Sequence, residues 1–303
     1  MYKKQILIFF YIVVSLSSFL YAFDYLFTPY SNPIEKKLKL LNREYKKELP
    51  FNNIILGSSR YEAIYLESSY FVNLASGGQS LEGSYYILDF LTKSYEMTNK
   101  TVYLGFDHYS IINDYPQDSD YVIKNVVDNI DYPNLRLLAI KNIILNREKL
   151  NNSFCQISHK DIVPIDKDTK KAFIWFEKYK NNNLTLEYFN KIYDLSKLYK
   201  FNLVLIEFPY TDFYNKEFLF KEPVYNKYLN TFKEVVELMP VYSYNHEKYT
   251  DEKNFKDFSH PQGLFAADMI FDTNSKIDGT YYLLNNENIL NYFKERKEYY
   301  ENK

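Results

Sequence analysis

Two short polar stretches, far apart in the chain, contain the residue types of a serine nucleophile system. The first, Gly57-Ser58-Ser59-Arg60, directly follows the aliphatic run Ile54-Ile55-Leu56. A buried strand that ends in glycine and hydroxyl residues is how α/β folds present a nucleophile at the carboxyl edge of a parallel sheet. Gly-Ser-Ser also forms ordinary turns and helix N-caps, so this stretch alone has two interpretations.

The second stretch is Asp257-Phe258-Ser259-His260-Pro261, just before an expected helix. Asp257 and His260 are three residues apart, so both can point into one cleft, where the carboxylate can orient the imidazole. Together with a serine they would supply the nucleophile, the base and the orienting acid of a catalytic triad. The alternative is that Asp257 or Ser259 caps the helix that opens at Pro261 and that His260 is a surface residue.

In this order, the two stretches resemble motifs of the SGNH/GDSL hydrolase superfamily. Gly57-Ser58-Ser59 is similar to the nucleophile motif, with Ser58 where the family has Asp, so the resemblance places the nucleophile at Ser59. The run from Asn73 to Ser80 resembles the second motif. Within that run the resemblance implies that Gly78, or failing that Gly77, is the oxyanion glycine.

The last motif of that superfamily, Asp-x-x-His, is matched by Asp257 and His260. The resemblance spans residues 54–271 and implies a flavodoxin-like three-layer α/β/α fold. It implies a Ser59–His260–Asp257 triad in a serine esterase or O-acyltransferase, chemistry that needs no cofactor. The chain looks most similar to membrane-anchored, divergent members linked to O-acylation of bacterial surface polysaccharides.

One motif departs from the family pattern. Asp107, in Gly105-Phe106-Asp107-His108, stands where the family has the Asn of the oxyanion hole. An ionised carboxylate would repel the oxyanion, and one lost donor costs about 3 kcal/mol of transition-state stabilisation. Asp107 could stay protonated in an apolar site. Alternatively, it could form a bidentate pair with Arg60, because the first and third strands of a doubly wound sheet are neighbours.

We hypothesise the Arg60–Asp107 pair, in which case reversing both charges should recover the stability that either single change loses. The Ser59 amide and Gly78 would then remain as oxyanion donors. His108 is a candidate third donor, although we expect it to be a surface residue of the loop.

Patterns typical of strands and of helices alternate along the rest of the chain, which predicts an α/β fold with a mainly parallel, five-stranded sheet. We expect strands at residues 54–56, 70–74, 101–106, 201–208 and 241–244. We expect helices at residues 81–95, 134–150, 186–199, 223–238, 261–271 and 285–303. Residues 107–132 look irregular and 151–168 look like a loop, so 107–168 is interpreted as an elaboration of one domain.

Residues 5–23 contain no charged side chain and are just long enough to cross a bilayer. The two lysines before this run favour a cytoplasmic N-terminus. A signal-peptidase site after Ala22 would have Leu20 at position −3, so we favour an uncleaved anchor over a cleaved signal. We therefore predict an anchor at 1–26, a helical stalk at 27–50, an extracytoplasmic α/β domain at 51–280 and a C-terminal helical tail at 281–303. We therefore expect a single-pass protein of the cytoplasmic (inner) membrane.

The net charge and the numbers of cysteines and histidines exclude some classes of ligand and partner. The net charge of −2 gives no electrostatic case for nucleic acid. The single cysteine, Cys155, excludes an intrachain disulfide or a cysteine metal cluster, and the four scattered histidines show no metal-ligand spacing. His159 and His246 are expected to be solvated in polar loops, and Trp175 is expected to pack in the core.

The sequence thus predicts a membrane-tethered, extracytoplasmic serine esterase or O-acyl(acetyl)transferase that acts on a cell-envelope glycan without a cofactor or metal. The resemblance also implies a multi-pass membrane acyltransferase as the partner that supplies the acyl group. A second interpretation, favoured by Asp107, is a non-catalytic relative that binds glycan or scaffolds a membrane O-acyltransferase. A third is an α/β surface protein whose motif matches arise by chance.

Overall fold

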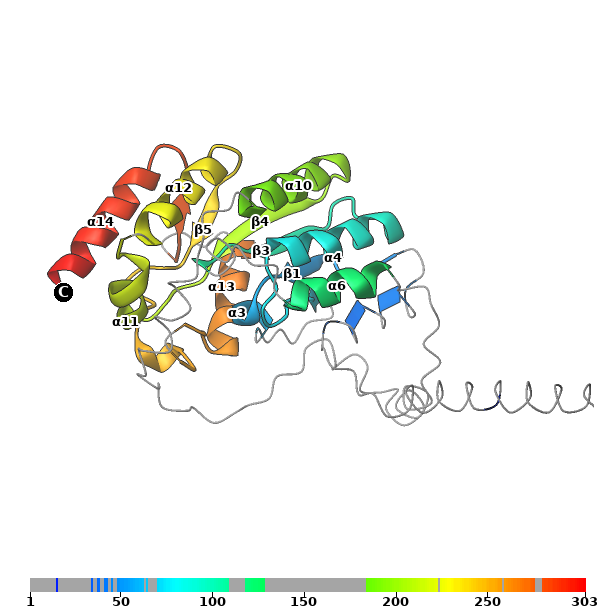
Figure 1. Cartoon of the computed structure of the whole chain (residues 1–303), viewed down its shortest axis with the longest axis horizontal. Coiled ribbons are helices and arrows are strands. Elements are labelled where there is room, and N and C mark those ends of the chain that lie inside the picture. The colour runs from blue at the N-terminus through cyan, green and yellow to red at the C-terminus, as the bar shows by residue number, and fades with distance from the viewer. Residues whose placement is uncertain are drawn as a thin grey trace, which may run out of the picture.

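The fold is seen in a computed structural model that describes residues 48–62, 64, 70–108, 118–128, 184–222, 224–257, 259–275 and 280–303, with single residues between 15 and 45. These residues form an α/β structure around one mostly parallel sheet (Figure 1). The helix predicted at 134–150 and the loop at 151–168 lie outside the described residues, as do Cys155, His159 and Trp175.

The sheet has six strands in the order β2-β1-β3-β4-β5-β6. The first five are parallel and β6 runs antiparallel to β5. The strands are β1 (Asn53–Leu56), β2 (Phe71–Asn73), β3 (Thr101–Gly105), β4 (Asn202–Glu207), β5 (Val241–Ser243) and β6 (Tyr282–Leu284).

The prediction of five strands was therefore wrong by one. β6 is a three-residue edge strand in which Tyr282 and Leu283 are exposed and only Leu284 is buried. It therefore lacks the alternation of buried and exposed residues by which a strand is recognised in a sequence. The five strands that were predicted all occur, with each end shifted by at most one residue.

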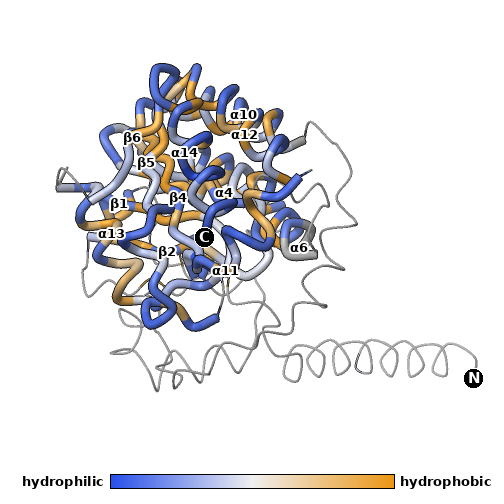
Figure 2. The backbone as a smooth tube through the Cα atoms, turned by 90° about the vertical axis from the view of Figure 1, so that its left-hand side faces the viewer, coloured by the Kyte–Doolittle hydropathy of each residue, from blue (hydrophilic) through white to orange (hydrophobic). Residues whose placement is uncertain are grey.

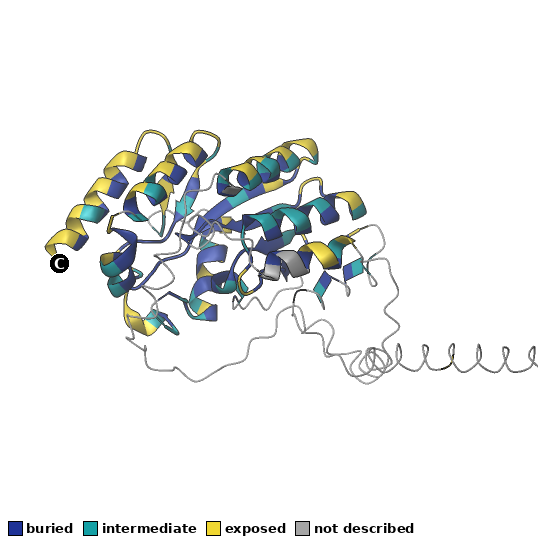
Figure 3. Cartoon of the chain, viewed as in Figure 1, coloured by how far each residue is buried: buried dark blue, intermediate teal, exposed yellow. Residues whose placement is uncertain are grey.

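Strand alternation sends successive side chains into two separate cores. Ile54 and Leu56 of β1 face the larger core, whereas Ile55 faces the smaller one. Figure 3 shows the strands buried between helices whose outer sides are exposed. In Figure 2, α10 and α12 alternate between hydrophobic and hydrophilic segments, as amphipathic helices with one buried face should.

The larger core lies under most of the helices, and the smaller core lies under α13. The helices on the larger core are α4 (Leu81–Ser94), α6 (Asp118–Asp128), α10 (Leu184–Leu198), α12 (Val224–Val236) and α14 (Ile289–Asn302). Helix α13 (Gly263–Ser275) lies on the opposite face of the sheet. Four short helical elements follow strands β1, β4 and β5 in the chain. These are α3 (Ser59–Glu62), α11 (Asp212–Tyr214), the π-helix η2 (Asn215–Leu219) and the 3-10 helix η3 (Glu252–Asn254).

Helix α6 occupies a segment that we predicted to be irregular. Its Ile123 and Val126 are buried in the larger core. Asp120 accepts hydrogen bonds from the Ser80 N–H (3.0 Å) and Ser80 Oγ (2.6 Å) at the start of α4. A side chain on Gly83 of α4 would collide with Asp120. Helix α6 therefore packs on α4 through these specific contacts of Asp120, which the hydrophobic periodicity of the sequence does not predict.

The segment before β1 packs against the domain at its described positions. Ile34, Leu38 and Leu41, which share one face of a helix, are fully buried in the larger core. Lys37 Nζ donates a hydrogen bond to the Ala75 carbonyl (3.3 Å). Among the described residues no helix has the length and hydropathy of a membrane span. The predicted anchor lies outside them.

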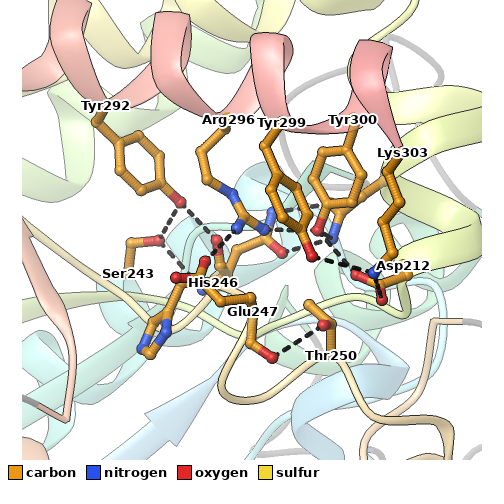
Figure 4. Close-up of polar contacts among 12 residues, drawn as sticks. Asp212, Ser243, His246, Glu247, Thr250, Tyr292, Arg296, Tyr299, Tyr300 and Lys303 are labelled. Atoms are coloured by element: carbon orange, nitrogen blue, oxygen red, sulfur yellow. Dashed lines mark hydrogen bonds and ion pairs between the residues drawn. The ribbon is translucent and has the colours of Figure 1, made fainter.

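The C-terminal helix α14, predicted as a polar tail, is bound to the domain through a buried polar network (Figure 4). Arg296 donates to Glu247 (2.9 Å) and to the Tyr300 hydroxyl (2.7 Å). The same hydroxyl accepts from Asn215 (3.1 Å), whose side chain exchanges two hydrogen bonds with Asn245 (2.9 and 3.0 Å). Helix α14 is therefore held to the loops that follow β4 and β5.

We expect Asn215→Ala to destabilise the protein by about 3 kcal/mol, because it leaves the fully buried Asn245 amide without its reciprocal partner. Urea unfolding measures the loss. Asn302→Ala is the control, since this amide is exposed at the end of α14, and it should cost under about 0.5 kcal/mol. Equal losses in the two variants would contradict the importance of the buried network.

Candidate active site

Ser59, His260 and Asp257 form a connected chain of hydrogen bonds. Ser59 Oγ lies 2.8 Å from His260 Nε2, and His260 Nδ1 lies 2.8 Å from Asp257 Oδ2. Because Asp257 can only accept at Nδ1, the network assigns the imidazole proton to Nδ1 and leaves Nε2 to accept from Ser59. The side chains of His260 and Asp257 are 30% and 41% exposed, so this arrangement is open to solvent.

Hydrogen bonds within residues 256–260 hold Asp257 and His260 in place. Asp257 Oδ1 accepts the backbone N–H groups of Ser259 (2.8 Å) and His260 (2.9 Å), and the Lys256 N–H donates to the His260 carbonyl (2.8 Å). Helix α13 begins only at Gly263, so Asp257 does not cap it. Burial alone would raise the pKa of Asp257. The hydrogen bonds from His260 and the two amides outweigh this effect and lower the pKa well below its usual range, so the carboxylate stays charged.

The turn that carries Ser59, residues 57–60, depends on a close contact between the Tyr61 ring and two glycines. Gly57 has φ +145°, and a Cβ there would lie 2.7 Å from the Tyr61 ring. A Cβ on Gly105, at the end of the neighbouring strand β3, would collide with the same ring. Tyr61 also stacks on Phe208 and donates its hydroxyl to the Ile206 carbonyl (2.7 Å). The ring thus fixes α3 across the carboxyl ends of β1, β3 and β4.

Asn73 links α3, which carries Ser59, to the loop that follows β2 and contains Gly77 and Gly78. Its side-chain nitrogen donates to the Tyr61 carbonyl (2.9 Å), and its oxygen accepts the Ala75 N–H (2.9 Å). The Ser76 N–H also donates to the Gly57 carbonyl (3.1 Å). Residues 73–76 are therefore held against the turn that carries Ser59.

Both candidate oxyanion glycines lie in this exposed loop. Gly77 lies beside Ser59, since a Cβ built on Gly77 would lie 4.0 Å from Ser59 Cβ. Gly78 has φ +72°, a conformation that glycine adopts without strain. The Ser59 N–H opens α3 and so has no intrahelical acceptor, which leaves it available to a ligand.

Asp107 and Arg60 are adjacent and fully buried, but they do not form the bidentate pair that we predicted. Arg60 Nη1 lies 3.6 Å from Asp107 Oδ2, an ion pair without a hydrogen bond. Asp107 Oδ2 instead accepts a hydrogen bond from Ser58 Oγ (2.9 Å). Ser58 and Asp107, the two positions at which the sequence departs from the motifs it resembles, thus contact each other.

The guanidinium of Arg60 makes its hydrogen bonds to backbone carbonyls. Nε donates to Ser259 (2.8 Å), and Nη2 donates to Phe208 (3.1 Å) and Pro209. The Tyr210 ring covers one face of the guanidinium, with 3.7 Å between Arg60 Cζ and the ring centroid. Arg60 is therefore fixed by the β4 loop and the His260 loop as well as by Asp107.

Two histidines are buried that we expected at the surface. His108 is fully buried: its N–H donates to the Tyr210 hydroxyl (2.7 Å) and its Nδ1 lies 2.6 Å from the Tyr214 hydroxyl. Burial, helped by the charge of Arg60, lowers its pKa to about 3, so the ring is neutral. His246 is 7% exposed and packs between Tyr249 and Tyr282. Both expectations failed because the loops after β3 and β5 turn inward.

Glu207 is a buried carboxyl that the sequence did not single out. It ends β4, is 1% exposed and accepts a hydrogen bond from Ser243 Oγ. Burial raises its pKa to about 8, against the opposing effects of Ser243, Arg60 and Arg296. The native protein therefore keeps this group largely protonated at neutral pH.

Several residues shape the site through contacts that the sequence did not predict. Asn, Ser and Tyr side chains are common, and the roles of these residues depend on which carbonyl, carboxylate or ring lies opposite. The only available signal was position, because three of them flank motif residues. The set is Ser58, Tyr61, Asn73, Tyr210 and Ser259.

No family model matches the chain, and no curated protein matches it.

The buried carbonyl contacts change the outcome expected from charge reversal. Combining Arg60→Asp with Asp107→Arg should not restore stability, because the acceptors at Ser259, Phe208 and Pro209 would face a carboxylate. We expect the double variant to be at least as destabilised as the worse single variant in urea unfolding. Recovery to near wild-type stability would show that the ion pair outweighs the carbonyl contacts.

Glu207 should make stability fall as pH rises. Its native pKa of about 8 lies above the ordinary glutamate value of about 4.3, so its contribution is complete below about pH 4.3 and is lost progressively up to about pH 8. Glu207→Gln cannot ionise and should therefore gain stability relative to wild type as pH rises from 5 to 8. Thermal unfolding at both pH values measures this gain. Exposed Glu287→Gln is the control, and equal behaviour of the two variants would refute the effect.

Proposed function

We propose that this protein is a membrane-tethered, extracytoplasmic serine esterase or O-acyl(acetyl)transferase that acts on a cell-envelope glycan. The observation that carries the proposal is the continuous Ser59–His260–Asp257 arrangement, with both linking distances at 2.8 Å. Residues that are some 200 positions apart reach this geometry at the carboxyl edge of a parallel sheet. Such an edge is where α/β folds bind their ligands.

In the proposed reaction, Ser59 Oγ attacks the ester carbonyl carbon while its proton passes to His260 Nε2. The C–O bond to the leaving alcohol then breaks, and His260 delivers the proton to that oxygen. Water or a glycan hydroxyl next gives its proton to His260 and attacks the carbonyl carbon of the acyl-serine. The bond from this carbon to Ser59 Oγ then breaks, and His260 returns the proton to Ser59 Oγ. Asp257 holds the proton on Nδ1 throughout and stabilises the imidazolium.

The oxyanion would be bound by backbone amides. The Ser59 N–H and the amide of Gly77 or Gly78 are the candidate donors, since Gly77 lies against Ser59. The side chain of Asp107 offers no N–H donor, and its carboxylate is engaged by Ser58 and Arg60. His108 is directed to Tyr210 and Tyr214, so we assign it no role as a donor.

The strand order supports the SGNH/GDSL resemblance. Strands β2-β1-β3-β4-β5 follow the order of flavodoxin-like sheets, with β6 as an added edge strand. We therefore propose the flavodoxin-like class for this domain. The glycan substrate, the membrane acyltransferase partner and the location outside the cytoplasmic membrane come from the resemblance and the apolar N-terminal run.

The buried Asp107 favours a second candidate function. A site without the third oxyanion donor also suits a non-catalytic protein that binds glycan or scaffolds a membrane O-acyltransferase. The two functions differ in whether Ser59 reacts. In the non-catalytic case the hydroxyl of Ser59 is dispensable.

The full chain, purified in detergent, should be labelled by a fluorophosphonate probe and should hydrolyse p-nitrophenyl acetate. Ser59→Ala should abolish labelling and lower the rate by at least about a thousandfold, because the nucleophile is removed. Ser275→Ala, an exposed serine at the end of α13, is the matched control and should behave as wild type. An unlabelled wild-type protein, with Ser59→Ala still supporting glycan acylation in cells, would favour the non-catalytic function.

A further inference from the structure

We infer that Arg60 is a positioning residue that sets the separation between the nucleophile Ser59 and the base His260. The inference rests on the proposed function, because it assigns Arg60 a role in the same reaction. Arg60 follows Ser59 directly in the chain, and Ser259 directly precedes His260. The guanidinium joins these two neighbours through the hydrogen bond from Arg60 Nε to the Ser259 carbonyl (2.8 Å).

This bond is one of very few between the two catalytic segments. Among the described residues, only it and the Ser59–His260 contact form hydrogen bonds between residues 57–62 and 255–262. The segments belong to different parts of the fold, since one follows β1 and the other precedes α13. Without Arg60, their relative placement would depend on apolar packing and on the catalytic hydrogen bond itself.

The guanidinium is itself rigidly placed. Its Nη2 donates to the Phe208 and Pro209 carbonyls, the Tyr210 ring lies against one face, and Asp107 lies 3.6 Å from Nη1. A planar guanidinium with donors in several directions can satisfy all these partners at once. A lysine ammonium is a single point charge and cannot donate to Ser259 and to the β4 loop in the same geometry.

Catalysis is sensitive to this placement, because a shift of about 1 Å in reacting groups can cost about 100-fold in rate. Arg60→Lys retains the positive charge beside Asp107 but loses the fixed Nε donor to Ser259. We therefore expect a protein that still folds, with kcat lowered about 100-fold and KM for p-nitrophenyl acetate changed less than about threefold.

A purely structural role for Arg60 predicts a different result. It would lower the fraction of active protein but leave the turnover of each active molecule unchanged. Titration with the fluorophosphonate probe counts active sites, so kcat can be expressed per labelled Ser59. Arg296→Lys is the matched control. This second buried arginine binds Glu247 and Tyr300 rather than the catalytic segments, and its substitution should leave kcat per site unchanged.

The experiment compares wild type, Arg60→Lys and Arg296→Lys well below their unfolding temperatures. A kcat per site in Arg60→Lys within about threefold of wild type would overturn the positioning role while leaving the proposed function intact. Absence of Ser59-dependent labelling in wild type would overturn both. If Arg60→Lys does not fold, Tyr210→Leu removes the ring that supports the guanidinium. It should lower kcat per site about tenfold, and an unchanged value would again reject the inference.

Discussion

A guanidinium that is fully removed from water requires acceptors and a counter-charge, and this requirement organises the carboxyl edge of the sheet. Arg60 is 1% exposed. An unpaired buried charge costs several kcal/mol, so the chain around it has to supply partners. The loop after β4 supplies the Phe208 and Pro209 carbonyls and the Tyr210 ring, and the His260 loop supplies the Ser259 carbonyl. The loops that surround the triad are therefore arranged around the residue next to its serine.

The Tyr61 ring imposes a second constraint, because it needs the space that side chains at Gly57 and Gly105 would fill. The parallel pairing of β1 with β3 brings Gly57 near Gly105, and the ring fits only there. Its hydroxyl ends on β4, so one side chain spans three strand ends. The packing of Tyr61 and the polar contacts of Arg60 thus fix the same short helix, which explains how a four-residue helix can hold a defined orientation.

Sequence patterns predicted the parallel strands and the motif residues better than the contacts between them. Long apolar runs such as Leu203–Ile206 mark buried strands, and the order of Ser59, Asp257 and His260 predicted which residues meet. The hydrogen-bond partners of Arg60 could not be predicted from the sequence. They are backbone carbonyls, which every residue has, and the fold determines which carbonyls face a donor. Helix α6, strand β6 and the burial of His108 were missed for the same reason, since each depends on tertiary contacts.

The candidate site has a partly exposed layer, which contains His260 and Asp257, and a buried charged layer, which contains Arg60 and Asp107. His260 and Asp257 are partly exposed, whereas Arg60 and Asp107 are fully buried beneath them. Because Arg60 balances the charge of Asp107, the carboxylate need not act on the oxyanion as a bare negative charge. Under the proposed function, Asp107 does not supply the amide donor that Asn supplies in the SGNH/GDSL motif, and one such donor is worth about 3 kcal/mol. In the proposed reaction, a loss of this size would favour esters and other activated acyl groups over amides, which is consistent with the proposed acyl transfer between hydroxyl groups.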